Sequence, residues 1–163
     1  MLITVCGLQG VGKTEVSKYI LKRTGGLVLR TDVIRKELIV EPRYTSEEMQ
    51  RIYEEMFGRA ERALMATPVI LDATFAKRSN REQARAIAEQ AKRDFRLVEV
   101  VCLDDETVRK RLEPMVGDAS DAKFAQYLQY KTFFEPIPIE EPHIIIDNSG
   151  SIESTRSQVI QYF

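Results

Sequence analysis

The residues with the clearest capacity for chemistry lie near the start of the chain, at positions 7–14. Their sequence is GLQGVGKT, which fits the pattern G-x-x-x-x-G-K-[ST] of a phosphate-binding loop. Glycines allow the backbone to curl so that successive N–H groups point at oxyanions. An apolar, strand-like run precedes the loop and a helical pattern follows it, as the motif requires. The sequence therefore predicts a site for a nucleoside triphosphate, rather than a glycine-rich turn with a fortuitous Lys-Thr pair.

Two side chains of this loop have definite expected roles. Lys13 supplies a compact cation that neutralises charge on the β- and γ-phosphates during catalysis, and the Thr14 hydroxyl is a ligand for Mg²⁺. The helix that begins near Gly12 adds its positive dipole end. The expected nucleotide-binding residues are Gly7, Gly10, Val11, Gly12, Lys13, Thr14 and Glu15.

A carboxylate and an arginine follow the second predicted strand. Asp32 and Arg35 are three positions apart at a predicted helix start, so their side chains can share one face. The Asp32 carboxylate could orient an acceptor hydroxyl and take its proton, while the planar Arg35 fork could hold an anionic group on the acceptor. The alternative is that Asp32 caps the helix and Arg35 is a solvated surface residue. We expect the functional role, because parallel strands would bring this pair to the same sheet edge as the phosphate loop.

A second carboxylate, Asp72, ends another apolar strand-like run. It could help to hold Mg²⁺ or contact the acceptor, and its alternative role is that of a cap or turn residue. The basic segment that follows contains Arg78 and Arg81, either of which could touch the acceptor. A solvated helix start is an equally good interpretation of these two arginines.

A pair of arginines near the end of a later helix predicts a lid. Arg109 and Arg111 precede a break at residues 114–120, which we interpret as a mobile loop within a lid at about 109–125. Arg111, supported by Arg109, is expected to close over the γ-phosphate and stabilise charge in the transition state. The alternative is that these cations satisfy the dipole of the helix C-terminus. Asn148, after the last predicted strand, could border the nucleotide base or belong to a plain turn.

The elements that must position these residues alternate along the chain. Strands are predicted at residues 2–6, 27–29, 69–72, 97–103 and 144–146. Helices are predicted at 12–22, 32–39, 46–66, 80–93, 104–113, 121–133 and from 151 onward, with caps at Asp32, Thr45, Ser79 or Asn80, Asp104, Ser120 or Asp121, and Ser151. This alternation favours one α/β domain over residues 1–163, a three-layer sandwich around a five-stranded parallel sheet.

Composition and charge narrow the class of protein. The net charge of −1 on 163 residues does not favour a nucleic-acid partner, although a local basic patch would permit one. Cys6 and Cys102 lie in apolar runs, which is typical of reduced, buried thiols in a cytoplasmic protein. No apolar run reaches the roughly 20 residues of a membrane span, and Met1 leads directly into a strand, so we expect neither a membrane partner nor a signal peptide.

The order of these motifs resembles a known family. GLQGVGKT, LRTDVIRKEL, VILDATF, VRKRLE and IIIDNSG are similar to segments of the small P-loop kinases that phosphorylate hydroxyl groups. That group includes AAA-type predicted kinases, the kinase domain of polynucleotide kinase, zeta toxins and chloramphenicol phosphotransferase. The resemblance spans nearly the whole chain, and its more specific element is D-x-x-R after the second strand. It implies a nucleoside-monophosphate-kinase type of sheet with a short helical lid.

The resemblance also implies roles for individual residues. Asp32 matches the general base of polynucleotide kinase-like members, and Arg35 matches the arginine that binds an acceptor phosphate. One departure concerns the lid, where relatives often carry R-L-x-x-R. Here Arg111-Leu112 is followed by Glu113-Pro114-Met115, so the second arginine is missing. This departure leaves open how much the lid contributes to catalysis.

Taken together, the motifs predict an ATP-dependent phosphotransferase that moves the γ-phosphoryl group to a hydroxyl, with Mg²⁺ as cofactor. The acceptor is a small molecule or a polynucleotide 5′-hydroxyl, and the sequence does not identify it. Two alternatives stay open. One is a nucleoside or nucleotide kinase of the same fold, and the other is a nucleotide-binding ATPase or switch that has no phosphoryl acceptor.

Overall fold

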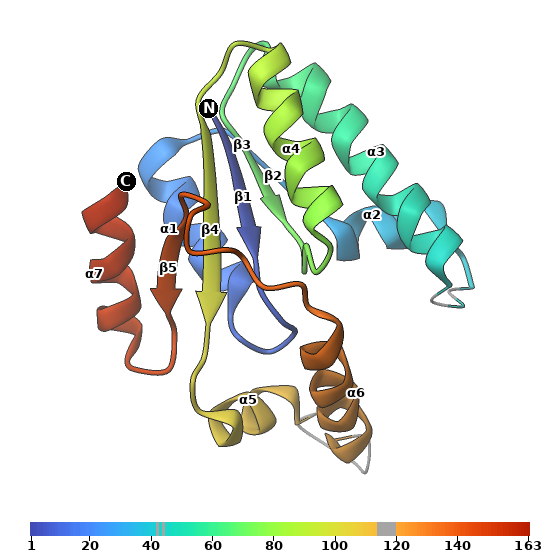
Figure 1. The fold of residues 1–163 in the computed structure, drawn as a ribbon, viewed down its shortest axis with the longest axis vertical. Helices are drawn as coiled ribbons and strands as arrows, with labels where there is room; N and C mark the ends of the chain where they lie inside the picture. The colour runs from blue at the N-terminus through green and yellow to red at the C-terminus, as the bar shows by residue number, and fades with distance from the viewer. Residues whose placement is uncertain (42, 44, 114–119) are drawn as a thin grey trace.

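A five-stranded parallel sheet forms the centre of the molecule, in the strand order β2-β3-β1-β4-β5 (Figure 1). The computed structural model describes residues 1–41, 43, 45–113 and 120–163. The strands are β1 Leu2–Cys6, β2 Leu27–Arg30, β3 Val69–Asp72, β4 Phe95–Val101 and β5 Ile144–Asp147. All five agree with the predicted strands to within two residues at each end. The predicted α/β class with a five-stranded parallel sheet is therefore confirmed.

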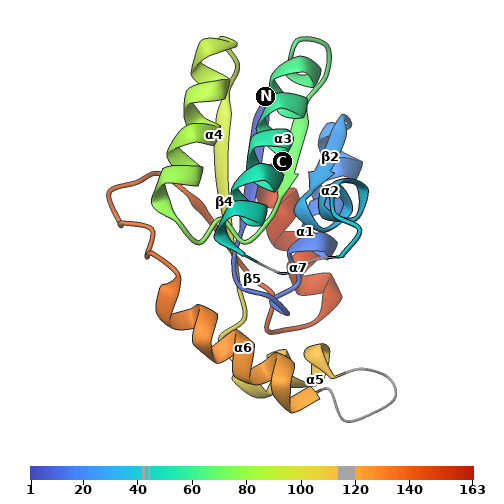
Figure 2. The same cartoon turned by 90° about the vertical axis from the view of Figure 1, so that its right-hand side faces the viewer.

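Helices cover both faces of this sheet (Figures 1 and 2). They are α1 Lys13–Thr24, α2 Thr31–Leu38, α3 Ser46–Leu64, α4 Arg78–Gln90, α5 Asp105–Leu112, α6 Ser120–Phe133 and α7 Ile152–Tyr162. One core cluster joins the sheet to α3 and α4, and a second joins it to α1 and α7. Successive residues of a strand point to opposite faces, so Leu2 lies in the first cluster and Ile3 in the second. Both side chains are fully buried, as expected for a parallel sheet covered on both faces.

The strand order decides which residues meet at the carboxyl edge of the sheet. Because β3 lies between β1 and β2, Asp72 is in register with Arg30 on one side and Val5 on the other. The phosphate loop leaves β1 at this edge. Helices α5 and α6 lie beyond the same edge, below the strand ends in Figure 1. The strand order therefore brings the predicted site residues at the ends of β1, β2 and β3 to one edge of the sheet.

Helix starts agree with the predicted caps in some places and differ in others. Thr45 caps α3, accepting the Glu48 N–H at 3.2 Å, and Asp104 and Ser151 cap α5 and α7. The predicted caps of α2 and α4 are wrong, because those helices begin earlier and their cap positions are occupied by Arg30 and Lys77. Asp32, Ser79 and Asn80 consequently lie inside the first turns of these helices.

Asp32, one of these mispredicted caps, is also the residue predicted to act as the catalytic base. Its carboxylate pairs with Arg35 and Arg30. A negative charge in the first turn of α2 also interacts favourably with the helix dipole.

In the part of the chain that the structure describes, no helix has the length and apolar character needed to cross a membrane.

Both cysteines are buried and neither forms a disulfide. Cys6 ends β1 and is fully buried, and this burial raises the pKa of its thiol to about 12. Because the thiolate is the reactive form, the Cys6 thiol is poorly nucleophilic at neutral pH.

We expect both thiols of the folded protein to resist Ellman's reagent at pH 8, because neither is accessible. In guanidinium chloride two thiols per chain should react, which the absorbance of the released thionitrobenzoate measures. Rapid reaction of either thiol without denaturant would contradict this packing.

Candidate functional site

At three positions, the backbone of the phosphate loop has a positive φ angle, which residues with a side chain rarely adopt. Gly7, Gly10 and Gly12 have φ angles of 138°, 82° and 99°. A Cβ atom at Gly7 would lie 2.3 Å from the Val100 carbonyl oxygen, and one at Gly12 would lie 1.9 Å from Nδ2 of Asn148. The loop therefore curls tightly between β1 and α1, against the ends of β4 and β5.

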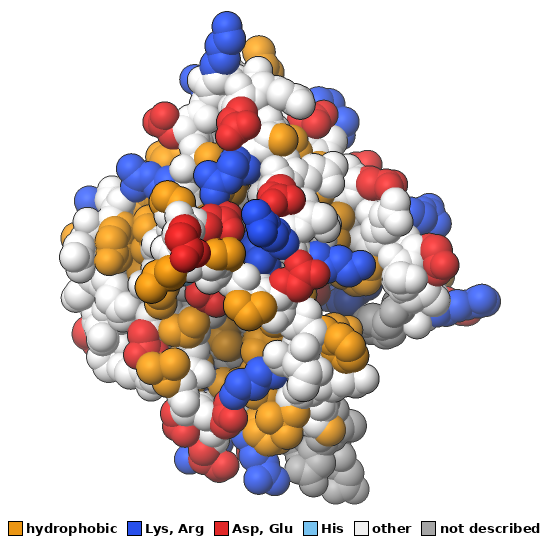
Figure 3. Space-filling model, viewed as in Figure 1, with side chains coloured by type: hydrophobic (Ala, Val, Ile, Leu, Met, Phe, Trp, Pro, Cys, Tyr) orange, Lys and Arg blue, Asp and Glu red, His pale blue; other side chains and the backbone are white. Residues whose placement is uncertain are grey.

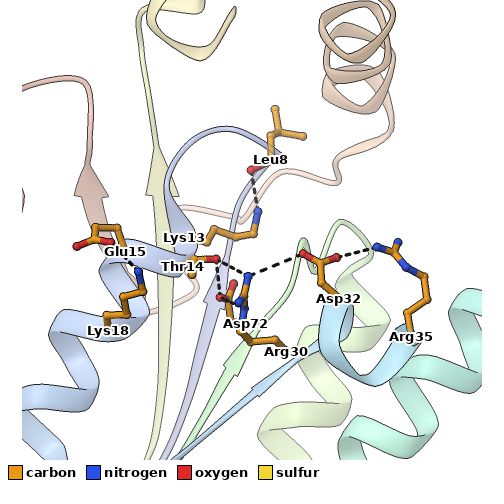
Figure 4. Close-up of polar contacts among 9 residues, drawn as sticks. All are labelled: Leu8, Lys13, Thr14, Glu15, Lys18, Arg30, Asp32, Arg35 and Asp72. Carbon is orange, nitrogen blue, oxygen red and sulfur yellow. Dashed lines mark hydrogen bonds and ion pairs between the residues drawn. The ribbon is translucent and has the colours of Figure 1, made fainter. Parts of the chain in front are cut away.

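Lys13 folds back across this loop. Its Nζ donates a hydrogen bond to the Leu8 carbonyl oxygen at 2.8 Å (Figure 4). Burial lowers the pKa of Lys13, while the carboxylates of Asp72 and Asp32 oppose that change. A cation thus lies inside the curl of the loop, close to the N-terminus of α1, where an anion is favoured.

Thr14, Asp72 and Arg30 form a connected polar cluster beside the loop. The Thr14 hydroxyl donates to Oδ2 of Asp72 at 3.0 Å, and Nη2 of Arg30 donates to the Thr14 oxygen at 3.1 Å. Nε of Arg30 lies 3.3 Å from the same Oδ2. Asp72 is buried, which raises the pKa of its carboxyl, and Lys13, Thr14 and Arg30 counteract that rise. The cluster joins three elements, α1, β3 and β2 (Figure 4).

The site residue that sequence reasoning missed is Arg30. No role was predicted for Arg30, which directly follows the strand predicted at residues 27–29. A charged residue that closes the run Leu27-Val28-Leu29 at the functional edge of the sheet was the available signal. Among the described residues, Nε of Arg30 is a buried nitrogen without a hydrogen-bond partner, although it lies beside the Asp72 carboxylate.

The predicted pair of Asp32 and Arg35 is present and lies next to this cluster. Nη2 of Arg35 donates to Oδ1 of Asp32 at 3.2 Å. The other carboxylate oxygen of Asp32 lies 3.9 Å from Nη2 of Arg30. The Asp32 side chain is 63% exposed, so its carboxylate is open to a ligand. Figure 4 shows Asp32 between the two arginines, with Arg30 toward the phosphate loop and Arg35 on the far side.

Arg109 and Arg111, the two arginines predicted for the lid, lie on α5 and contact different parts of the molecule. Nη2 of Arg111 donates to the Asn148 carbonyl oxygen at 2.8 Å, and Nη1 lies 3.5 Å from the carbonyl oxygen of Val11. Arg111 therefore reaches the phosphate loop from α5. The Arg109 guanidinium lies 5.8 Å from the centre of the Phe124 ring on α6, so it joins α5 to α6. Of the loop predicted at 114–120, residues 114–119, including Met115, lie outside the described residues.

Asn148 links the loop to the far edge of the sheet. Its Nδ2 donates to the Val11 carbonyl oxygen at 2.8 Å, while its Oδ1 accepts the Thr155 hydroxyl at 2.7 Å. The side chain thus holds the backbone of the loop in place. Glu15 extends along α1 and pairs with Lys18 at 3.2 Å (Figure 4).

Arg81, one of the two arginines that could have touched an acceptor, is buried and is not exposed for such a contact. Its side chain is buried, and its guanidinium donates to the carbonyl oxygens of Phe75 at 2.8 Å and Glu135 at 3.0 Å. Arg81 lies one turn inside α4 and faces the segment that returns from α6, so it holds two stretches of backbone together. Arg78 is exposed and pairs with Glu82 at 2.7 Å, which agrees with the alternative of a solvated helix start.

The donor atoms at the edge fit a magnesium ion carried by phosphates. Among the described residues, no three His, Cys, Asp or Glu side chains are grouped so that they could hold a metal ion. The Thr14 hydroxyl and the Asp72 carboxylate offer two hard oxygens 3.0 Å apart. Mg²⁺ typically takes one or two such protein oxygens and completes its shell with phosphate oxygens and water.

The chain matches one family model and shares its fold with solved structures. A family model described as an AAA domain matches residues 2–137. No curated protein matches the chain. Solved structures share the fold, among them a sugar kinase from Janibacter sp. HTCC2649, with 16% identity and a TM-score of 0.72 over 99% of this chain and 92% of that one.

Two further structures are similar over nearly the whole chain. A gluconokinase from Sinorhizobium meliloti 1021 has 18% identity and a TM-score of 0.68 over 98% of this chain and 91% of that one. The Mycobacterium tuberculosis APS kinase, solved with AMPPNP and APS, has 17% identity and a TM-score of 0.69 over 98% and 95%. The predicted resemblance to small P-loop kinases is confirmed at the level of the fold.

Replacement of Arg81 tests its structural role. We expect Arg81→Met to lower the free energy of unfolding by about 3 kcal/mol, because it leaves buried carbonyl groups without donors. The matched change Arg78→Met, on the same helix, should cost less than about 0.5 kcal/mol, because it removes only an exposed ion pair. Urea denaturation measures both values, and equal small effects would contradict the assignment of Arg81.

Proposed function

The chain belongs to the AAA domain family, and on that premise we propose that it is an ATP-dependent phosphotransferase that acts on an acceptor hydroxyl. The observation that carries this proposal is the position of Asp32. Its carboxylate is 63% exposed, and Arg30 connects it to the Thr14–Asp72 pair beside the phosphate loop. A phosphate site and an accessible base thus lie side by side at the same sheet edge.

On the donor side, the phosphate loop and Lys13 hold the triphosphate through backbone N–H groups and a half-buried cation. Thr14 and Asp72 would hold Mg²⁺, which when bound neutralises charge on the β- and γ-phosphate oxygens. Arg111 lies beside the loop, where its guanidinium can stabilise the negative charge that grows on the transferred group.

On the acceptor side, Asp32 receives the proton of the attacking hydroxyl. The acceptor oxygen forms a bond to Pγ while the bond from Pγ to the bridging oxygen of ADP breaks. Arg35 pairs with Asp32 from the side away from the loop, so it orients that carboxylate and offers N–H donors to an anionic group of the acceptor.

A small hydroxyl compound with an anionic group is the acceptor we favour. Structural neighbours bear the names sugar kinase, gluconokinase and APS kinase. The net charge of −1, and the mixture of basic and acidic side chains on the face seen in Figure 3, give little support to a long polynucleotide. The two free thiols are consistent with a cytoplasmic enzyme, where thiols stay reduced.

Removal of the proposed base is the first test. We expect Asp32→Asn to lower kcat by about 100-fold or more, because the amide cannot take the hydroxyl proton, while the affinity for ATP measured in EDTA stays near the wild-type value. The control Asp94→Asn changes an exposed carboxylate next to the amino end of β4 and should keep full activity. A coupled assay of ADP release measures the rates, and wild-type turnover by Asp32→Asn would sink the assignment of the base.

The acceptor can be found by the same assay across sugars, sugar acids, nucleosides, antibiotics and 5′-hydroxyl oligonucleotides. For the acceptor that stimulates ADP release, we expect Arg35→Gln to raise the acceptor KM about tenfold or more and to leave the KM for ATP unchanged, since Arg35 faces away from the phosphate loop. An equal rise in both KM values would show that Arg35 does not belong to the acceptor side.

A further inference from the structure

Arg30 contacts the oxygen atoms that the proposed metal ion would need. Its Nη2 donates to the Thr14 hydroxyl oxygen at 3.1 Å, and its Nε lies 3.3 Å from Oδ2 of Asp72. The Thr14 hydroxyl has a single hydrogen, which it donates to that same Oδ2 at 3.0 Å. The hydroxyl oxygen therefore meets Arg30 with its lone pairs, through which it would also bind a cation.

Two cations cannot share these oxygens at little cost. A guanidinium and a divalent ion within a few ångströms of each other repel strongly at a site as enclosed as Asp72, which is only 5% exposed. Either the guanidinium holds Thr14 and Asp72, or the metal ion does.

A second carboxylate lies within reach of the displaced guanidinium. Oδ2 of Asp32 is 3.9 Å from Nη2 of Arg30, on the side away from Thr14 (Figure 4). The Arg30 side chain is 36% exposed, although its Nε is enclosed beside Asp72. A small movement would therefore exchange Asp72 for Asp32 as the partner of Arg30.

We propose that Arg30 is a positioning residue that competes with the divalent cation for Thr14 and Asp72 and passes to Asp32 when the cation binds. This inference rests on the proposed function, because it assumes that Mg²⁺ accompanies the nucleotide at this edge. Metal binding on the donor side is thereby coupled to the carboxylate of the acceptor side.

A purely structural role for Arg30 makes a different prediction. If the guanidinium only fastened β2 to β3, its loss would weaken nucleotide binding by a similar factor with and without metal. Competition instead changes the ratio of the two affinities, because only the metal-loaded complex requires Arg30 to leave. The measurement that separates these roles is the dissociation constant of fluorescent mant-AMPPNP, in saturating Mg²⁺ and in EDTA.

For Arg30→Gln, we expect the ratio of the mant-AMPPNP dissociation constant in EDTA to that in Mg²⁺ to rise about tenfold above the wild-type ratio. The reason is that a charge that competes with the metal ion has been removed. The matched control is Arg59→Gln, which removes an arginine paired with Glu37 and Glu55 at 2.6 and 2.7 Å. Its ratio should equal that of the wild type.

Each other outcome overturns the inference. The competition is contradicted if the wild type binds mant-AMPPNP in a Mg²⁺-dependent way and the ratio in Arg30→Gln is unchanged or lower. That result leaves the proposed function intact. A wild type that binds no mant-AMPPNP under either condition contradicts both. If Arg30→Gln does not fold, Arg30→Met serves instead, because methionine keeps a long unbranched side chain and also removes the charge. Its ratio should still exceed that of the wild type, and an unchanged ratio overturns the proposal.

Discussion

The register of β3 between β1 and β2 places Asp72 opposite Val5 on one side and Arg30 on the other. This constraint brings a buried carboxylate next to the start of the phosphate loop and next to a strand that ends in arginine. The hydrogen bond from Thr14 to Asp72 then fixes the first turn of α1 against β3. Because Asp72 is enclosed, its charge is tolerated only through Lys13, Thr14 and Arg30. The proposed donor and acceptor sides are thus parts of one polar cluster.

The turn that follows Asp72 is held from several directions. Gly7 donates its N–H to the Thr74 carbonyl oxygen at 3.1 Å, which ties the phosphate loop to this turn. Phe75 has a φ angle of 48°, a conformation that costs free energy for a residue with a side chain. Its N–H donates to the Tyr53 hydroxyl oxygen at 3.0 Å and its carbonyl accepts from Arg81. Arg81 also binds the backbone at Glu135, so the segment returning from α6 is anchored to the turn beside the site.

Local patterns were sufficient to predict the five strands, the phosphate loop and the closeness of Asp32 and Arg35, because each depends on neighbours in the sequence. The role of Arg81 was not predictable in that way. An arginine near a helix start is usually solvated, and its carbonyl partner at Glu135 lies 54 positions away. Arg30 was missed for a similar reason, since its importance depends on the register of β2 with β3. Asn148 reaches the loop across 137 positions, a contact that periodicity does not contain.

Phosphoryl transfer to a hydroxyl differs from simple ATP hydrolysis in where the γ-phosphoryl group ends. ³¹P NMR of the products formed from ATP, Mg²⁺ and pooled hydroxyl acceptors distinguishes these fates directly. Transfer predicts one phosphomonoester resonance for each ADP formed, with inorganic phosphate as a minor product. ADP accompanied only by inorganic phosphate, at a rate that the acceptors do not change, would contradict the assignment of Asp32 and the loop to a phosphotransferase.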